Sequence, residues 1–149
     1  MTTSLPDSVL DAIACEPVRT RPARLFCAVT GPPAATVVTD FLSLQHWSKL
    51  RYFLEGVRRQ AGADFDDAGF AYDTDERDPD EVPFTGVELY MPWDGVLVSR
   101  SAFDRLMARF FAAVTRGAIA QDDAATREPW WPDFVAAVDD IQRRCDNQK

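Results

Sequence analysis

Histidine and cysteine are scarce in this sequence, and their scarcity excludes most metal centres. His46 is the only histidine in 149 residues, so an HExxH pair and any centre with two histidine ligands are ruled out. Cys15, Cys27 and Cys145 are widely spaced and odd in number, which favours a reducing compartment over a disulfide framework. We expect buried, unreactive thiols at Cys27 and Cys145 and no zinc site.

Motifs for phosphate binding and for nucleophilic catalysis are also missing. The chain contains no GxSxG, GxxxxGK[ST] or GxGxxG pattern. His46 lies next to Trp47 in a segment with helical periodicity, where a lone histidine is more often structural than catalytic. The sequence therefore predicts a protein that is not an enzyme, with no catalytic residue, no metal site and no cofactor.

Long hydrophobic runs are absent as well. No apolar run approaches the roughly 18–20 residues that a membrane-spanning helix needs. Residues 1–17 contain neither the basic stretch nor the apolar core of a signal peptide. We therefore expect a soluble, cytoplasmic protein that does not use a membrane as a partner.

The composition is that of an ordinary globular protein. Hydrophobic residues make up 46% of the chain and charged residues 27%, so wholesale disorder is not expected. A length of 149 residues predicts one domain that spans residues 1–149. The packing of the N-terminal segment, residues 1–35, stays open at this point.

Apolar periodicity predicts the main elements. A stripe of apolar residues at intervals of three and four predicts the longest helix over about 34–61, and similar stripes predict helices over about 100–117 and from Pro132 onward. Alternation predicts a β-hairpin over about 86–99 and another strand over about 69–73. The expected fold is α+β: a small antiparallel sheet packed against several helices.

Glycine, proline and serine indicate where these elements end. Gly62 and Gly117 are the expected stops of the first two helices, and Ser99 or Ser101 is the expected cap at the start of the second. The sequence PWDG, residues 92–95, predicts a four-residue turn in the hairpin. Trp93 would lie on this turn.

One short stretch carries the whole net charge of −8. Residues 64–81 hold nine carboxylates and a single basic residue, Arg77, while the rest of the chain is balanced. A neutral domain with one negative strip favours cationic partners and repels nucleic acid. The nine carboxylates are those of Asp64, Asp66, Asp67, Asp73, Asp75, Glu76, Asp78, Asp80 and Glu81.

The strip does not fit a calcium loop or an acid–base site. In an EF-hand reading from Asp73, the sixth position is Asp78 where glycine is needed, and the twelfth is Phe84 where a bidentate glutamate is needed. Acid–base catalysis needs carboxylates held in a cleft with at least one pKa shifted by burial, whereas a strip this dense is expected to face solvent.

Two further interpretations of the strip remain. It could be a solvated loop that only aids solubility, or a recognition surface for a basic protein. Phe70 and Tyr72 before it and Phe84 after it predict that it is displayed between strands, which favours recognition. A small carboxylate-dependent metal-binding enzyme and a general acidic scaffold domain stay open as alternatives.

Residues 70–114 resemble a known family. The pattern is an aromatic strand, an acidic linker, Pro83-Phe84-Thr85-Gly86-Val87, an alternating strand that ends in tyrosine, a second strand that closes on serine, and a helix with an early Phe103. It is similar to the immunity proteins for ribonuclease toxins of bacterial contact-dependent growth inhibition (CDI) systems. With the helix before it, the resemblance covers roughly residues 36–115.

The resemblance implies an inhibitor that binds the C-terminal toxin domain delivered by a neighbouring cell and occludes its basic active site. It implies the role and not the contacts, which we predict from charge and exposure. Trp93 is the candidate aromatic anchor, because exposed tryptophans are often binding hot spots. The alternative for Trp93 is a turn residue that folds back onto the sheet. The candidate electrostatic contacts are Asp73, Asp75, Glu76, Asp78, Asp80 and Glu81.

Overall fold

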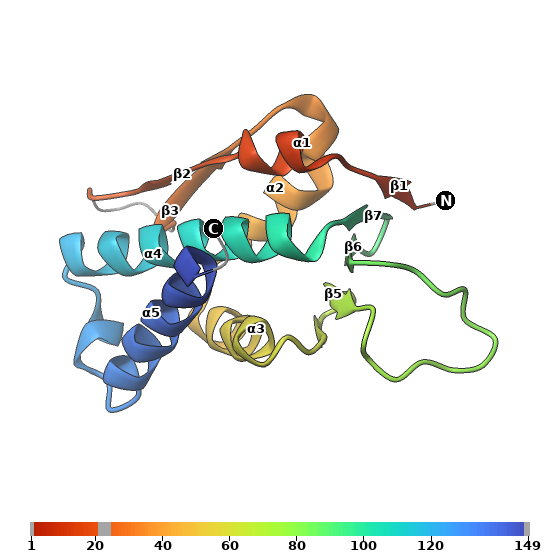
Figure 1. The fold of residues 1–149 in the computed structure, drawn as a ribbon. Helices are drawn as coiled ribbons and strands as arrows, with labels where there is room; N and C mark the ends of the chain where they lie inside the picture. Colours follow the sequence, from red (N-terminus) through yellow and green to blue (C-terminus); the bar gives the residue numbers. More distant parts are fainter. Residues whose placement is uncertain (1, 21–24, 148–149) are drawn as a thin grey trace.

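The computed structural model of the chain describes residues 2–20 and 25–147 and confirms the α+β class (Figure 1). Five α-helices, two 3₁₀ helices and seven strands lie in the described residues. In chain order they are β1 Thr3–Ser4, α1 Asp7–Asp11, β2 Ala14–Pro17, β3 Cys27–Thr30, η1 Pro33–Ala35, α2 Thr36–Leu42, α3 Trp47–Arg59, β4 Ala63–Phe65, β5 Ala68–Tyr72, β6 Val87–Met91, β7 Asp94–Val98, α4 Arg100–Ala120, η2 Ala124–Arg127 and α5 Trp131–Asn147.

The main sheet contains the predicted hairpin and the predicted strand before it, but it is mixed rather than antiparallel. Its strand order is β1-β7-β6-β5-β4, in which β4 to β7 form an antiparallel meander. The N-terminal β1 runs parallel to β7, and the backbone N–H of Leu5 donates to the carbonyl of Leu97 at 2.8 Å. Sequence periodicity missed β1 because two residues are too few to show an alternation.

The described part of the N-terminal segment, residues 1–35, packs onto the helical layer. Leu10 and Ile13 are 1% and 2% exposed, so α1 contributes directly to the core. Strands β2 and β3 form a separate antiparallel pair beside α4 (Figure 1). The side-chain amide of Gln121, at the end of α4, donates to the backbone carbonyls of Val18 and Leu25 and ties the pair down.

The prediction of a single long helix over 34–61 is wrong, because this segment is not one continuous helix. It is two α-helices, α2 and α3, interrupted at residues 43–46, and the longest helix is α4 with 21 residues. The side chain of Gln45 accepts hydrogen bonds from the backbone N–H groups of Phe26 and Cys27 and donates to the carbonyl of Cys27. The interruption thus supplies partners to the open edge of β3, which a local pattern cannot reveal.

Helix α4 begins where one of the two predicted caps places it but does not end at Gly117. The Ser99 hydroxyl accepts a hydrogen bond from the backbone N–H of Ala102 at 3.1 Å, whereas Gly117 lies inside the helix. A methyl group on Gly117 would overlap the backbone carbonyl of Phe26. Gly117 therefore does not end the helix. Its lack of a side chain allows α4 to lie close to the backbone at Phe26, just before β3.

Replacing Gly117 with alanine is expected to lower the free energy of unfolding by about 2 kcal/mol, because the added methyl group overpacks the contact with Phe26. Helix propensity alone predicts the opposite sign, a gain of up to about 1 kcal/mol. Urea denaturation measures the difference. Gly95→Ala is the matched control, since a methyl group there meets only ordinary contacts of 3.5 Å and beyond. A stability gain in Gly117→Ala would contradict the packing explanation.

The helices cover one face of the main sheet. Helix α2 packs over β6 and β7, and α3 contacts β4 (Figure 1). The strand side chains on this inner face are buried: Ala68, Phe70, Tyr72, Val87, Leu89, Met91, Val96 and Val98. The alternate side chains of β6 and β7, Glu88, Tyr90 and Leu97, are only half-buried.

A buried carboxylate joins the sheet to three helices. Asp104 of α4 is 1% exposed and accepts hydrogen bonds from the hydroxyl of Tyr72 at 3.2 Å and the side-chain amide of Gln60 at 3.0 Å. The Arg144 guanidinium of α5 lies 3.5 Å from it and donates to backbone carbonyls at the end of α3. Burial raises the pKa of Asp104, and Arg144 opposes that shift.

Among the described residues, no helix combines the length and the apolar character needed to cross a bilayer.

Candidate functional site

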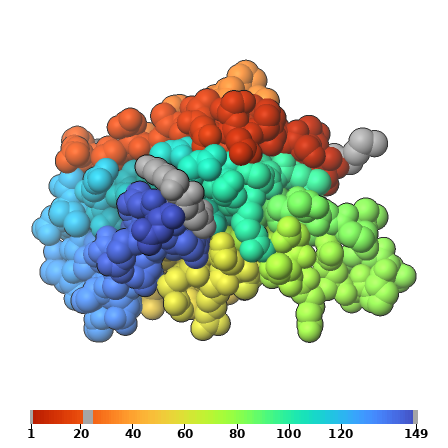
Figure 2. All heavy atoms as spheres, in the orientation of Figure 1, coloured from red at the N-terminus to blue at the C-terminus, as the bar shows by residue number. Residues whose placement is uncertain are grey.

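The candidate site is built around the loop that joins β5 to β6. We call residues 73–86 the acidic loop. Its two ends meet, because the Asp73 N–H donates to the Gly86 carbonyl at 3.0 Å and the Gly86 N–H donates to the Asp73 carboxylate at 2.8 Å. The loop extends away from the body of the protein (Figures 1 and 2). A compact loop with adjoining ends is an Ω-type loop, a class that frequently carries function.

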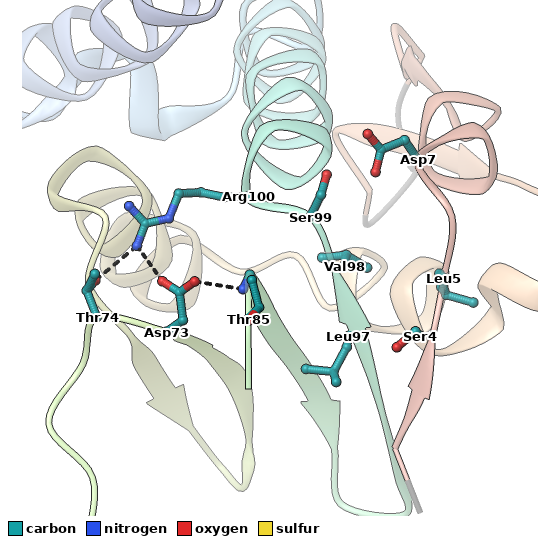
Figure 3. Close-up of a pocket in the computed structure, with 11 residues that line it drawn as sticks. Ser4, Leu5, Asp7, Asp73, Thr74, Thr85, Leu97, Val98, Ser99 and Arg100 are labelled. Atoms are coloured by element: carbon teal, nitrogen blue, oxygen red, sulfur yellow. Dashed lines mark hydrogen bonds and ion pairs between the residues drawn. The ribbon is translucent and has the colours of Figure 1, made fainter. Parts of the chain in front are cut away.

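Asp73 fixes the base of the acidic loop to the start of α4. Its carboxylate forms an ion pair with Arg100 at 2.9 Å, and the same guanidinium nitrogen donates to the Thr74 hydroxyl at 3.0 Å (Figure 3). The Gly86 N–H is the largest cause that lowers the pKa of Asp73, and Arg100 adds to it. This carboxylate is a structural anchor.

Asp75 is the second anchor. Its carboxylate accepts hydrogen bonds from the backbone N–H groups of Tyr72 at 2.8 Å and Gly62 at 3.0 Å. The bond to Gly62 connects the acidic loop to the segment that enters β4. Two of the six carboxylates predicted to contact a partner therefore already have partners within the chain.

The middle of the acidic loop has internal structure. Arg77 lies over the ring of Phe84, with the guanidinium carbon 4.9 Å from the ring centroid. The N–H of Glu81 donates to the carbonyl of Asp78 at 3.0 Å, and Pro79 occupies the second position of this turn, where its fixed φ fits. The loop is thus shaped before any partner binds.

Four carboxylates remain on the outside of the acidic loop. They belong to Glu76, Asp78, Asp80 and Glu81, all of which are exposed. Within the described part of the chain, none of these side chains forms a hydrogen bond or an ion pair. They are the members of the predicted contact set that are available to another molecule.

The other part of the acidic strip lies at a different end of the sheet. Asp66 and Asp67 form the tight turn between β4 and β5, with φ values of 53° and 62°. Asp64 of β4 accepts a hydrogen bond from the hydroxyl of Tyr90 at 2.7 Å. The strip that is continuous in sequence is therefore divided in space by β5.

Trp93 is 67% exposed, but it does not adjoin the acidic loop. The predicted four-residue turn is wrong: Met91 pairs with Asp94, so only Pro92 and Trp93 form the turn and PWDG extends into β7. This turn and the acidic loop are at opposite ends of β6, a five-residue strand of about 13 Å. The structure thus places the predicted contacts in two groups rather than one.

The sheet meander is more acidic than the strip alone. Residues 63–98 contain eleven carboxylates and one basic residue, for a net charge of −10, while the other 113 residues carry +2. Glu88 and Asp94 add to the strip because β6 and β7 fold back beside β5. Sequence reasoning omitted both since they lie beyond the dense run, although the predicted hairpin could have placed them.

The carboxylates do not converge on a point. No cluster of three or more His, Cys, Asp or Glu side chains suited to a metal ion is found in residues 2–20 and 25–147. His46 precedes α3 instead of lying within it, and its Nδ1 is 3.0 Å from the Ser48 hydroxyl. The high density of carboxylates thus reflects a distributed charge.

The prediction of buried thiols at Cys27 and Cys145 is confirmed. Cys27 and Cys145 are buried, and burial contributes to raising the pKa of each. Cys15 is only half-buried, and a hydrogen bond from the Cys27 thiol lowers its pKa. All three are free thiols.

A cavity of about 610 Å³ lies at the base of the acidic loop (Figure 3). Asp73 and Arg100 form one wall, and Asp7 and Ser4 face them from the N-terminal segment. Arg100 is already paired with Asp73, so the cavity has no free cation among these lining side chains.

Comparisons of the chain with protein-family models, with curated protein sequences and with solved structures gave no match. The resemblance to CDI immunity proteins therefore stays a prediction based on residues 70–114.

Replacing Asp73 with alanine is expected to open the base of the acidic loop, because Arg100 and the Gly86 N–H both lose their acceptor. We expect the Gly86 amide to exchange with deuterium about tenfold faster or more at neutral pH. Asp80→Ala, an exposed position on the same loop, is the control. Equal protection of Gly86 in wild type and Asp73→Ala would contradict the anchoring role.

The same measurement has a defined pH dependence. The pKa of Asp73 is lowered in the folded protein, so its anchoring contribution is present above the unfolded pKa of about 3.9 and is lost as the pH falls through the lowered value. The ratio of the Asp73→Ala exchange rate to that of wild type should therefore fall toward one in acid. A ratio that stays constant would show that the ionised carboxylate is not the anchor.

Proposed function

We propose that this chain is an immunity protein that binds a cognate CDI nuclease toxin domain and neutralises it by covering the basic active site. The observation that carries the proposal is the acidic loop. Glu76, Asp78, Asp80 and Glu81 are exposed on it, and among the described residues none of them forms an ion pair. The resemblance of residues 70–114 supports the same role.

The physical basis is competition with a polyanion. A ribonuclease holds phosphates with cationic side chains, so its active site has the field that attracts these four carboxylates. The loop is held in shape by Asp73, Asp75 and the Arg77–Phe84 contact, which reduces the entropy lost on binding. A toxin that binds this loop cannot bind RNA at the same surface.

The alternatives have less support. A carboxylate-dependent metal enzyme needs convergent ligands, and the described residues contain no group of three or more His, Cys, Asp or Glu side chains suited to a metal ion. A loop that only aids solubility has no need of the anchors at Asp73 and Asp75, which hold its outer carboxylates in one arrangement.

The proposal predicts a toxin gene immediately upstream, and the deciding experiment is co-expression with the C-terminal nuclease domain that this gene encodes. A tagged chain should retain that domain through affinity purification and abolish its ribonuclease activity. Pancreatic ribonuclease, a basic enzyme that is not cognate, is the control and should stay active. If the upstream domain neither co-purifies nor loses activity, the proposed function is wrong.

A further inference from the structure

The main sheet has a second face that the helices leave open. We call the residues Glu88, Tyr90 and Leu97, together with Asp64, the outer face. The first three alternate with the buried residues of β6 and β7 and are half-buried. Helices α2, α3 and α4 contact the main sheet, and Phe103 of α4 packs against the buried Phe70 and Tyr72 of β5.

The floor of the outer face is flat because its smaller residues are glycine and alanine. Tyr90 pairs with Gly69 on one side and with Gly95 on the other, and Glu88 pairs with Ala71. An aromatic ring between two glycines covers backbone that would otherwise be bare. On the outer face, the ring of Tyr90 therefore stands above neighbours that have small side chains or none.

Tyr90 is also fixed in position. Its hydroxyl donates to the Asp64 carboxylate at 2.7 Å, a bond that crosses β5 to reach β4. Burial and this carboxylate raise the pKa of Tyr90, so the hydroxyl remains a donor at neutral pH. A ring held at its tip loses little freedom when another surface covers it.

The outer face connects the two groups of predicted contacts. The acidic loop is at one end of β6, and the turn with Trp93, which is 67% exposed, is at the other. Glu88 and Tyr90 lie on the strand between them. A partner that reached from the loop to Trp93 would cover a continuous surface and not two isolated spots.

We propose that the outer face and Trp93 form the second half of the contact with the nuclease domain and receive a flat, arginine- and lysine-rich part of its surface. This inference rests on the proposed function and extends it from the acidic loop to the sheet. The loop would guide the approach of the partner, and the outer face would hold it after contact.

Charge and chemistry favour a basic occupant. Glu88 and Asp64 are acidic, and the one basic residue in 63–98, Arg77, lies over Phe84 in the acidic loop. Tyr90 and Trp93 can pack against the hydrocarbon stems and the cationic groups of lysine and arginine. An uncharged or acidic partner would leave these carboxylates covered without a counter-charge.

Trp93→Ala tests the inference on the complex with the upstream nuclease domain, by surface plasmon resonance. We expect dissociation to be about 30-fold faster, the size of a hot-spot loss, with association changed less than about threefold. Glu88→Lys should also speed dissociation. The matched control is Ile119→Ala, which removes a 59% exposed apolar side chain from α4 and should change neither rate. Thermal unfolding checks that each variant is folded.

The outcomes separate the two proposals. If wild type binds and Trp93→Ala and Glu88→Lys dissociate at the wild-type rate, the outer face is not part of the contact and the proposed function stands. If wild type does not bind the nuclease domain, the proposed function fails and this inference fails with it. Faster dissociation of both variants, with Ile119→Ala unchanged, supports the outer face.

Discussion

Replacing Glu76, Asp78, Asp80 and Glu81 with lysine is expected to slow association with the nuclease domain about 100-fold at low ionic strength. Electrostatic steering raises association rates by up to about 10³ over neutral encounters, and these are the exposed carboxylates of a projecting loop. We expect added salt to slow the association of wild type, because salt screens the attraction, and to change the association rate of the variant much less. Both effects can be measured by stopped flow at salt concentrations from about 20 mM to about 500 mM. Over this range the Debye length falls from about 20 Å to about 4 Å, so the attraction between exposed charges becomes strongly screened.

The choice of positions follows from the structure. Charge density alone would include Asp73 and Asp75, but their carboxylates accept hydrogen bonds from Gly86, Tyr72 and Gly62. Replacing them would disturb the loop itself, so slower association could then have a structural cause. The four outer carboxylates form no such bonds, and their replacement tests charge alone.

The matched control changes the net charge equally at other sites. Asp40, Glu128, Asp133 and Asp139 are exposed residues outside residues 63–98, and their replacement by lysine also brings the net charge of −8 to zero. We expect the control to slow association far less, because the local field and not the total charge steers the partner. Equal slowing in both variants would show that the acidic loop has no special role.

Replacing Asp104 with alanine is expected to lower the free energy of unfolding by about 3 kcal/mol. The change removes the acceptor of the Tyr72 hydroxyl, which is completely buried, and the counter-charge of Arg144. Breaking a buried pair by removing one partner costs roughly 3–5 kcal/mol, and the partial exposure of Arg144 places this site at the lower end. Urea denaturation of wild type and variant measures the loss.

Asp104→Asn separates hydrogen bonding from charge. The amide keeps an acceptor for Tyr72, so we expect a smaller loss of about 1 kcal/mol. A loss as large as that of the alanine variant would show that the negative charge, and not the acceptor, holds the cluster together.

The stabilities of wild type and of Asp104→Asn should also depend on pH in different ways. Because the pKa of Asp104 is raised in the folded state, the folded protein binds more protons between the unfolded pKa of about 3.9 and the raised value. Wild-type stability contributed by this group is therefore present below pH 4 and is lost as the pH rises through the raised pKa. The stability difference between wild type and Asp104→Asn should shrink over that interval, whereas a constant difference would contradict the raised pKa.

The two halves of the proposed contact would have different kinetic effects. Long-range attraction depends on exposed charge, so changes in the acidic loop should act on association. Short-range packing depends on apolar and aromatic contact, so changes at Trp93 should act on dissociation. This separation lets a single set of binding traces evaluate the loop and the outer face independently.

Local pattern was sufficient for the elements whose side chains repeat regularly. The alternation of Val87, Leu89 and Met91 predicted β6, and the same three residues are buried in the sheet. The pattern failed at residues 43–46, where Leu44 continued the helical stripe but is 42% exposed. The chain leaves the helix there because the Gln45 side chain bonds to β3, and no local preference encodes that contact.

The sequence by itself determined the charge distribution, since the position of each carboxylate along the chain is fixed before folding. It also determined the scarcity of histidine and cysteine ligands. Only the tertiary structure decided which carboxylates are available to a partner. Asp73 meets Arg100, 27 positions along the chain, and Asp75 meets Gly62, 13 positions back.

The position of Trp93 relative to the acidic loop was likewise decided by the tertiary structure. The sequence placed Trp93 in a turn, but its 67% exposure is known from the structure, and its separation from the acidic loop follows from the antiparallel pairing of β5, β6 and β7. Pairing places the two ends of a strand as far apart as its length, whatever the sequence distance between them. Charge is a property of each residue, whereas availability and distance depend on which segments fold against one another.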